Sequence, residues 1–531
     1  MTEVLTPDNV RIEKLENGFT VVLQELRYSP VAAVCLSYSV GPLWETKNTR
    51  GLSHFCEHMM FRGSEKFGPG KYWQMVQRNG GQANAYTSKD ITVYYSVVPK
   101  AGLNDILELE SDRMRNCIMS EDDFKSEKAV ILEEELLTQR DNPDGSLDAL
   151  MFGRAFMSHP YGRPITGTQD DISSFSLKGL KNFYGNFYTP TNAVISVVGD
   201  IDCRTVSARI SGLFGKFPGY VPVRPTVTAE PAQTDQARVE MEHPSHLPRL
   251  SIGFKVPQAD HPDSAPLSLI SVFLASGRSS RFEELLVKPS LVLDISVSTS
   301  TLVMPGLYTV RAVLPSGGSV EEVEEIIFSE LNSIGDNGID SEVLAKLKNR
   351  RQAWSIISDA DPMGISRRFS TGYVKFADPY YYWNSIKSCD AVSDSDIRDA
   401  AQRYFKKSNS TTAVMHPSSE GNEAVRHTAI SSSMSETDMV PPSAQKPSDS
   451  DNTNKLLKAP EVSASDNSEE ITLENGIRII LKRDTSFPIV SLGFSCSMGS
   501  DREPPESTGL AEITAETTLY GTPAEDSIRF N

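Results

Sequence analysis

Two histidines and a glutamate lie close together in the segment "GLSHFCEHMMFRGS", residues 51–64. The chain has only eight histidines, yet His54 and His58 are four residues apart and Glu57 stands beside the second. Residues four apart lie on one face of an α-helix, so both imidazoles can reach one metal ion. Zinc accepts imidazole and carboxylate ligands, and a neighbouring glutamate can take a proton from a zinc-bound water. The HxxEH order therefore predicts a hydrolytic zinc site, and a chance triple would occur in about one of 100 such chains.

A third metal ligand is expected on the carboxylate-rich segment "SEKAVILEEELLTQR", residues 126–140. A catalytic zinc takes three protein ligands and keeps one position open for water. Glu127 and Glu134 are seven residues apart, so they share one face of a helix. Glu133 and Glu135 are expected to point elsewhere, into solvent. Taken alone, the segment is equally typical of a charged surface helix.

Composition narrows the class of protein. At 531 residues the chain is too long for one hydrophobic core, so several domains are expected. The net charge of −18 argues against nucleic acid or an anionic membrane as a partner. No apolar run approaches the ~20 residues of a membrane span. Six scattered cysteines without a CxxC pair favour a reducing compartment. The N-terminal residues lack a signal-peptide pattern, which predicts a cytoplasmic protein, or a periplasmic one if a signal peptide was removed.

Strand-like and helix-like segments alternate over the first ~220 residues, about one large domain of chain. "GFTVVLQEL", "DITVYYSVV" and "NAVISVVGDI" have the β-branched and aromatic content of strands, and "EKAVILEEELLTQR" is typical of a helix. A second unit of similar style runs from about residue 238 to residue 417. The expected fold class is α+β, with helices over a largely antiparallel sheet.

The C-terminal part of the chain repeats its beginning. Residues 473–522 match residues 15–64 without a gap, at an offset of 458, and Gly51 recurs as Gly509. The chemical residues do not recur, since His54, Glu57 and His58 correspond to Glu512, Ala515 and Glu516. The repeated scaffold therefore does not need the two histidines and the glutamate, which favours a functional role for them in the first copy.

These motifs resemble the pitrilysin-type (inverzincin) zinc metallopeptidases, the family that includes insulin-degrading enzyme and mitochondrial processing peptidase. That family has HxxEH, then a glutamate ligand some 75 residues later with another glutamate seven residues before it. Here Glu134 lies 76 positions after His58, and "ExxVIxEE" has the form "EKAVILEE". The resemblance implies that His54, His58 and Glu134 bind one Zn²⁺ per chain. It also implies that Glu57 is the catalytic base and that Glu127 supports the site without binding the metal.

A further segment, "GGQANAYTSKDITVYYSVVP", residues 80–99, resembles the family's "NAxTxxDxT" segment, whose edge strand receives the substrate backbone. An edge strand offers unpaired N–H and C=O groups to an extended peptide. The resemblance thus makes Asn84, Ala85 and Tyr86 the candidate substrate-binding residues. A purely structural strand is the alternative.

The resemblance implies a fold of tandem related α/β-sandwich domains that form one half of a clamshell, followed by the start of a degenerate second half. We expect a catalytic domain at 1–225, a related domain at 226–418, a linker at 419–468 and the truncated second half at 469–531. The linker is expected because the segment is rich in Ser, Pro, Asp, Glu and Asn and has no aromatic residue.

The implied function is a zinc endopeptidase that hydrolyses extended or unfolded peptides. The alternative is a non-catalytic or partner-dependent subunit, or a peptide-binding protein, on the same fold. The implied partners are peptide substrates and a missing C-terminal half or partner subunit, without nucleic acid or membrane.

Overall fold

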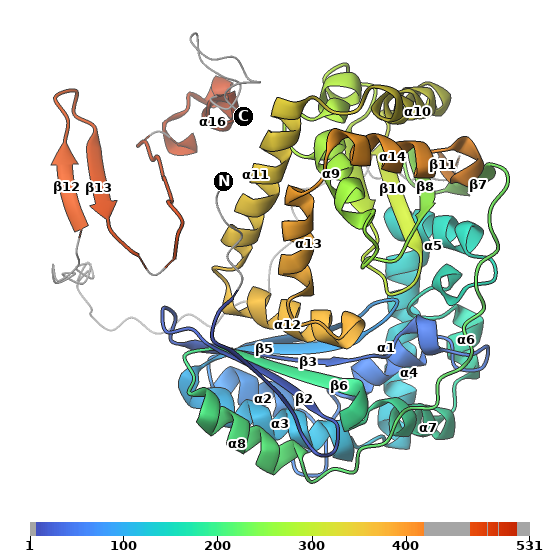
Figure 1. Cartoon of the computed structure of the whole chain (residues 1–531), viewed down its shortest axis with the longest axis vertical. Helices are drawn as coiled ribbons and strands as arrows, with labels where there is room; N and C mark the ends of the chain where they lie inside the picture. Colours follow the sequence, from blue (N-terminus) through green and yellow to red (C-terminus); the bar gives the residue numbers. More distant parts are fainter. Residues whose placement is uncertain (1–6, 419–467, 486, 498, 518–531) are drawn as a thin grey trace, which may run out of the picture. The chain divides into compact units, whose positions relative to one another are not determined.

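The computed structural model describes residues 7–418, 468–485, 487–497 and 499–517 (Figure 1). The chain divides into two compact units, Met1–Gly421 with Gly493–Asn531, and Asn422–Leu492. The predicted linker at 419–468 lies outside the described residues except for Ser468. None of the described helices is both long enough and apolar enough to cross a bilayer.

The first sheet has six strands in the order β1-β2-β6-β3-β5-β4. They are β1 (Val10–Lys14), β2 (Thr20–Glu25), β3 (Val31–Tyr38), β4 (Gln82–Thr87), β5 (Thr92–Pro99) and β6 (Ala193–Gly199). Neighbouring strands are antiparallel, except that β2 runs parallel to β6. β4 is an edge strand, with β5 as its one partner in the sheet.

Helices cover one face of the first sheet, and α2, α3 and α8 lie below it in Figure 1. They are α1 (Leu52–Met59), α2 (Lys71–Arg78), α3 (Leu103–Asn116), α4 (Glu121–Glu135), α6 (Gln169–Ser174), α7 (Leu177–Phe187) and α8 (Cys203–Phe214). Val21 and Leu23 of β2 join the core under these helices, while Val22 faces the opposite side of the sheet. This alternation is the period of a strand, and it means that both faces must be covered.

The second sheet has five strands in the order β7-β11-β8-β10-β9. They are β7 (Ala237–His243), β8 (Arg249–Val256), β9 (Asp294–Thr299), β10 (Gly306–Val313) and β11 (Ser410–Pro417). The later helices are α9 (Ser264–Ala275), α10 (Val320–Asn337), α11 (Ser341–Ser358), α12 (Pro362–Phe376), α13 (Tyr381–Asp390) and α14 (Asp394–Tyr404). Leu269 of α9, Ile327 of α10 and Ile397 of α14 form a core with this sheet. The α+β fold class expected from the sequence is thus confirmed.

Each sheet is covered on one face by a helix from the part of the chain that forms the other sheet. Helix α12 packs on the first sheet, where Ile365 and Phe369 meet Val22 and Val194 (Figure 1). Helix α5 (Pro143–Ala155), which precedes the second sheet in sequence, packs on that sheet through Met151. Both helices begin with proline after a capping side chain, Asn142 or Asp361, as the sequence pattern of a helix start requires.

The sequence repeat is also a structural repeat. β12 (Ser468–Thr472) and β13 (Arg478–Lys482) pair antiparallel in the register of β1 and β2, at the same offset of 458 residues. Helix α16 (Leu510–Thr517) corresponds to α1 and carries Glu512, Ala515 and Glu516 in place of the two histidines and the glutamate. The counterpart of β3 is not formed as a strand, and Val490 and Leu492 are 98% and 97% exposed.

A buried ion pair lies inside the first core. Arg113 and Glu110, one turn apart on α3, are 2% and 1% exposed and are joined by two hydrogen bonds of 2.7 and 2.6 Å. The guanidinium group of Arg113 also lies 4.3 Å from the ring centroid of Tyr94 and 4.7 Å from that of Tyr72. The desolvation of each charge is therefore offset by its partner, and either charge alone would be uncompensated.

We predict that Arg113→Ala lowers the free energy of unfolding by about 3 to 5 kcal/mol, because it leaves the Glu110 carboxylate buried without an opposite charge, with only the Tyr72 hydroxyl as a donor. The matched control is Arg115→Ala on the same helix, whose exposed side chain should contribute less than about 0.5 kcal/mol. Urea denaturation followed by tryptophan fluorescence and circular dichroism measures both. The double variant Glu110→Leu/Arg113→Met should recover much of the loss. Equal destabilisation by Arg113→Ala and Arg115→Ala would contradict the account.

Candidate metal centre

The buried carboxylate of Glu45 fixes the first turn of α1. It accepts hydrogen bonds from the backbone N–H groups of Gly51, at 2.8 Å, and Ser53, at 2.9 Å. A helix leaves these N–H groups unpaired, and its dipole favours a negative charge at this end. Burial nevertheless raises the pKa of the Glu45 carboxyl to about 6. Gly51 has a φ of +86°, and a Cβ there would lie 2.3 Å from the carbonyl oxygen of Thr166, so only glycine fits.

His54 and His58 project from α1 toward Glu134 on α4. His54 Nε2 lies 3.6 Å from Glu134 Oε1, and His58 Nε2 lies 3.2 Å from Glu134 Oε2. Zinc bonds of about 2.1 Å in a tetrahedron place the ligand atoms about 3.4 Å from one another. The three donor atoms lie within 4.8 Å of one another, and within the described ranges no other group of three His, Cys, Asp or Glu does so. The donor set and its spacing therefore fit zinc.

The ionisation of Glu134 also suits a cation. Hydrogen bonds with His54 and then with His58 hold the pKa of the Glu134 carboxyl far below its usual range. Glu134 is consequently ionised at neutral pH, as a metal ligand must be. His54 Nδ1 is buried and has no hydrogen-bond partner in the described structure.

Glu127 orients His58 from the far side of the ring. Its Oε2 lies 3.0 Å from His58 Nδ1, and its other oxygen forms an ion pair with Arg62. An ionised carboxylate can only accept, so His58 Nδ1 must carry the proton. His58 Nε2, which faces Glu134, is then the ring atom left to bind a metal ion. Glu127 is 4% exposed and shares the helix face of Glu134, as its spacing predicted.

Glu57 is held beside the histidines by the end of the edge strand. It is 9% exposed, and its Oε2 accepts a hydrogen bond of 2.6 Å from the hydroxyl of Thr87, the last residue of β4. This bond fixes the direction of the carboxylate and leaves its other oxygen available. Thr87 thus links the candidate base to the strand that is predicted to bind substrate.

Helix α4 is positioned at both ends. Ser120 caps its N-terminus by accepting the backbone N–H of Asp123 at 3.1 Å, and a π-helical turn, Leu136–Arg140, follows its last residue. Glu133 is exposed, as the sequence predicted, but the same prediction was wrong for Glu135, which is buried. A π-helical turn follows Glu135 directly, and periodicity on an isolated helix predicts neither such a turn nor the distant segments that cover a residue beside it.

Asn84, Ala85 and Tyr86 lie in the middle and end of β4, at the edge of the first sheet. They pair with Tyr95, Tyr94 and Val93 of β5 in sequence order. On the free side of β4, the backbone N–H of Ala85 donates to the side chain of Asn84 at 2.8 Å. A carbonyl group of an incoming peptide would replace the Asn84 side chain as the acceptor of that N–H group. Until then, the side chain of Asn84 satisfies this donor.

Sequence reasoning missed three residues that support this site, namely Glu45, Arg62 and Thr87. Arg62 lies four residues after His58, so helical spacing could have placed it near the ligands. Thr87 lies in the segment that was considered for substrate binding. Glu45 has no local signal, because it reaches the first turn of α1 across a loop.

Comparison with known protein families identifies a peptidase domain in the region that holds the candidate site. The family model for the insulinase peptidases, family M16, matches residues 20–169, which hold all the candidate site residues. The model for the M16 inactive domain matches residues 174–351.

Curated relatives and solved structures resemble the chain over most of its length. The zinc protease PqqE of Helicobacter pylori is 30% identical over 418 residues, which are 76% of this chain and 92% of that protein. The crystal structure of a protease from Helicobacter pylori has a TM-score of 0.74 and 28% identity, and covers 78% of this chain and 100% of that one.

The periplasmic protease PqqL from Escherichia coli shares the fold, with a TM-score of 0.66 and 19% identity. That match covers 91% of this chain but only 56% of the PqqL chain. These likenesses confirm the resemblance drawn from the motifs, and its architecture of tandem domains that form half of a clamshell. The chain belongs to the M16 family of peptidases, and its curated relative from Helicobacter pylori is named a zinc protease.

Proposed function

We propose that the chain is a zinc-dependent endopeptidase that hydrolyses extended or unfolded peptides. One observation carries the proposal: the donor atoms of His54, His58 and Glu134 converge next to the buried carboxylate of Glu57, at the end of an edge strand. His54, His58 and Glu134 would hold one Zn²⁺. Bound there, zinc would supply Lewis acidity, which polarises a peptide carbonyl and acidifies water.

Glu57 would act as the general base and then as the general acid. Its free oxygen would take a proton from the attacking water and pass it to the nitrogen of the leaving amine. The hydroxyl of Thr87 donates to Oε2 of Glu57, so the other carboxylate oxygen would accept the proton. Glu127 would keep the proton of His58 on Nδ1, which reserves Nε2 for the metal.

The free side of β4 would bind the substrate by strand addition. Main-chain hydrogen bonds at Asn84, Ala85 and Tyr86 would hold the peptide, which must be extended to pair. Thr87 ends the same strand and contacts Glu57, so a peptide paired with β4 would bring a peptide bond to the base. Folded proteins without an accessible extended segment would be excluded.

A partner-dependent subunit is the second candidate. The PqqL chain extends beyond the part that this chain matches, and α16 carries Glu512, Ala515 and Glu516 where α1 carries its chemical residues. A second half, from a partner or from further chain, would then complete the substrate chamber. The same β4 edge and the same zinc ligands would serve in that assembly.

We predict that the purified chain binds about one zinc and that His58→Ala abolishes binding, because two ligands hold zinc far less firmly than three. Glu134→Gln should weaken binding. The matched control is Glu133→Gln, whose side chain is exposed on the same helix, and it should keep the metal. Zinc is measured by plasma mass spectrometry after dialysis, with circular dichroism to check folding. Full zinc content in His58→Ala would refute the ligand assignment, as would metal loss in Glu133→Gln alone.

We predict that Glu57→Gln keeps zinc but lowers hydrolysis of a quenched fluorescent peptide by at least about 100-fold, because an amide of the same shape cannot take a proton. The two measurements together separate the candidates. Wild-type rates in Glu57→Gln would exclude it as the base. A zinc-loaded wild-type chain that cleaves no peptide, alone or at high concentration, would favour the partner-dependent subunit.

A further inference from the structure

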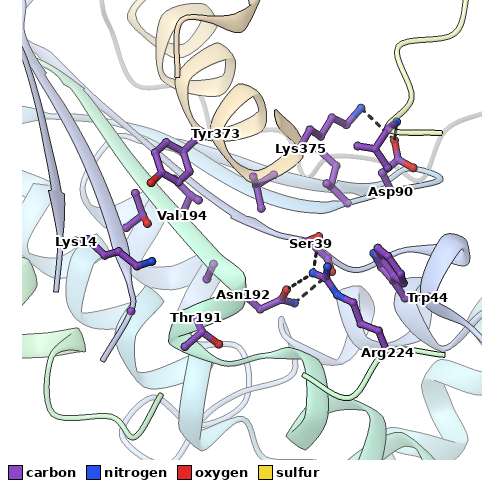
Figure 2. A pocket seen from close by; sticks show the side chains of 16 residues that line it. Lys14, Ser39, Trp44, Asp90, Thr191, Asn192, Val194, Arg224, Tyr373 and Lys375 are labelled. Atoms are coloured by element: carbon purple, nitrogen blue, oxygen red, sulfur yellow. Dashed lines mark hydrogen bonds and ion pairs between the residues drawn. The ribbon is translucent and has the colours of Figure 1, made fainter. Parts of the chain in front are cut away.

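Two pockets of the described structure are lined by several positively charged side chains. They differ in how many of those charges already bond to other groups of the protein. Figure 2 shows the first, of about 240 Å³, with Lys14, Arg224 and Lys375 in its lining. Arg224 donates to the side-chain oxygen of Asn192 at 2.8 Å, and Lys375 lies 3.6 Å from the carboxylate of Asp90. Two of its three cations are therefore already engaged by the protein.

The second pocket, which we call the arginine pocket, has a volume of about 440 Å³ and lies between α11, α12, α13 and the edge strand β4. Its lining includes Arg351 of α11, Arg367 and Arg368 of α12, and Tyr86 of β4. Its other lining residues are neutral, so no acidic side chain reaches into it. A concentration of positive charge is unexpected in a chain with a net charge of −18.

Only one of the three arginines is neutralised. Arg368 forms an ion pair with Asp359 behind the pocket. Arg351 has a hydrogen bond with the thiol of Cys389, but its buried Nε has no hydrogen-bond partner in the described structure, and none of the described ion pairs includes it. The exposed side chain of Arg367 forms none of the ion pairs that the described residues contain. A buried, unpaired guanidinium N–H is costly, and the cost is removed when a carboxylate accepts from it.

Tyr86 places this pocket next to the candidate active site. It directly precedes Thr87, whose hydroxyl contacts Glu57. Side chains alternate along a strand, so Tyr86 lies on the face of β4 opposite Ala85 and Thr87. Ala85 joins the core under the helices, whereas Tyr86 packs with Val374 of α12. A peptide paired with β4 alternates in the same way, so every second side chain would face the arginine pocket.

We propose that the arginine pocket binds a carboxylate of the substrate within about three residues of the cleaved bond, so that peptides with an acidic group there are preferred. This inference rests on the proposed function, because it assumes that substrate lies along β4. Arg351 and Arg367 supply guanidinium donors that no carboxylate of the described residues engages, and a guanidinium can hold a carboxylate with two parallel hydrogen bonds. Repulsion between the peptide carboxylate and the rest of the acidic chain is screened beyond ~10 Å. The attraction between that carboxylate and the nearby arginines therefore decides whether acidic peptides are preferred.

The carboxylate has two possible sources, an Asp or Glu side chain and the C-terminus of the peptide. The experiment uses zinc-loaded full chain and a set of quenched peptides. Glu or Gln is placed at each position within about three residues of the cleaved bond, with a free or an amidated C-terminus. The measured quantity is the ratio of kcat/KM between the Glu and Gln peptides, and between the free and amidated peptides.

We expect a ratio of about tenfold at one position in the wild type, falling to about one in Arg351→Gln/Arg367→Gln. Arg350→Gln removes the same charge from α11 outside the pocket and should keep the tenfold ratio. A tenfold ratio for the free over the amidated C-terminus, lost in the same double variant, would support the pocket and identify the terminal carboxylate. Ratios near one throughout the wild type would overturn the proposal, as would a tenfold ratio that survives the double variant.

A binding measurement separates failure of this proposal from failure of the proposed function. The anisotropy of a labelled Glu peptide and of its Gln partner is measured with Glu57→Gln protein and with the same variant lacking Arg351 and Arg367. Tighter binding of the Glu peptide that disappears with the arginines would support the pocket, even if the wild type hydrolyses nothing. Binding to Glu57→Gln that differs neither between the Glu and Gln peptides nor between their free and amidated forms would refute the pocket, even if hydrolysis is efficient.

Discussion

The candidate site depends on where helix α1 begins, and a single carboxylate decides this. Glu45 takes the backbone N–H groups of Gly51 and Ser53, and Gly51 supplies the left-handed turn that leads into the helix. Each residue of an α-helix rotates the next by about 100°, so a start displaced by one residue would turn both imidazoles away from α4. Glu503 makes the same two bonds to Gly509 and Ala511 in the repeated segment, which lacks the histidines. The cap therefore belongs to the scaffold, and the chemistry was placed on a helix start that exists without it.

Much of this arrangement could be predicted because it follows from periodicity. The four-residue spacing of His54 and His58, and the seven-residue spacing of Glu127 and Glu134, each define one face of a helix, and the structure brings the two faces together. The continuous apolar run of Val21, Val22 and Leu23 is likewise typical of a strand with two covered faces, which the structure has. The α+β class, the family and the repeated scaffold were accessible for the same reason. Each of them follows from patterns within short segments of the sequence, which do not depend on contacts with distant residues.

What the sequence did not reveal is set by contacts between distant segments. Glu135 stands beside a predicted ligand and was expected in solvent, but it is buried at the end of α4. Arg113 is a charged residue on a helix, and its burial depends on Glu110 and on rings from distant segments, among them those of Tyr72 and Tyr94. Tyr86 lies more than 260 residues before Arg351 and Arg367 in the sequence, and the three line one pocket because α12 packs across the first sheet. A pattern within one segment contains no information about which partner covers it.

The exchange of α5 and α12 also sets an order of events while the chain is being made. The first sheet is complete once β6 has emerged at Gly199, but the helix that covers Val22 and Val194 ends at Phe376. At about 5–20 residues per second, the ribosome needs roughly 10–35 s to supply it. The second sheet has no such delay, since α5 precedes all of its strands. During this time one apolar face of the first sheet in the nascent chain is exposed to water. A chaperone at the ribosomal exit would have to shield this face.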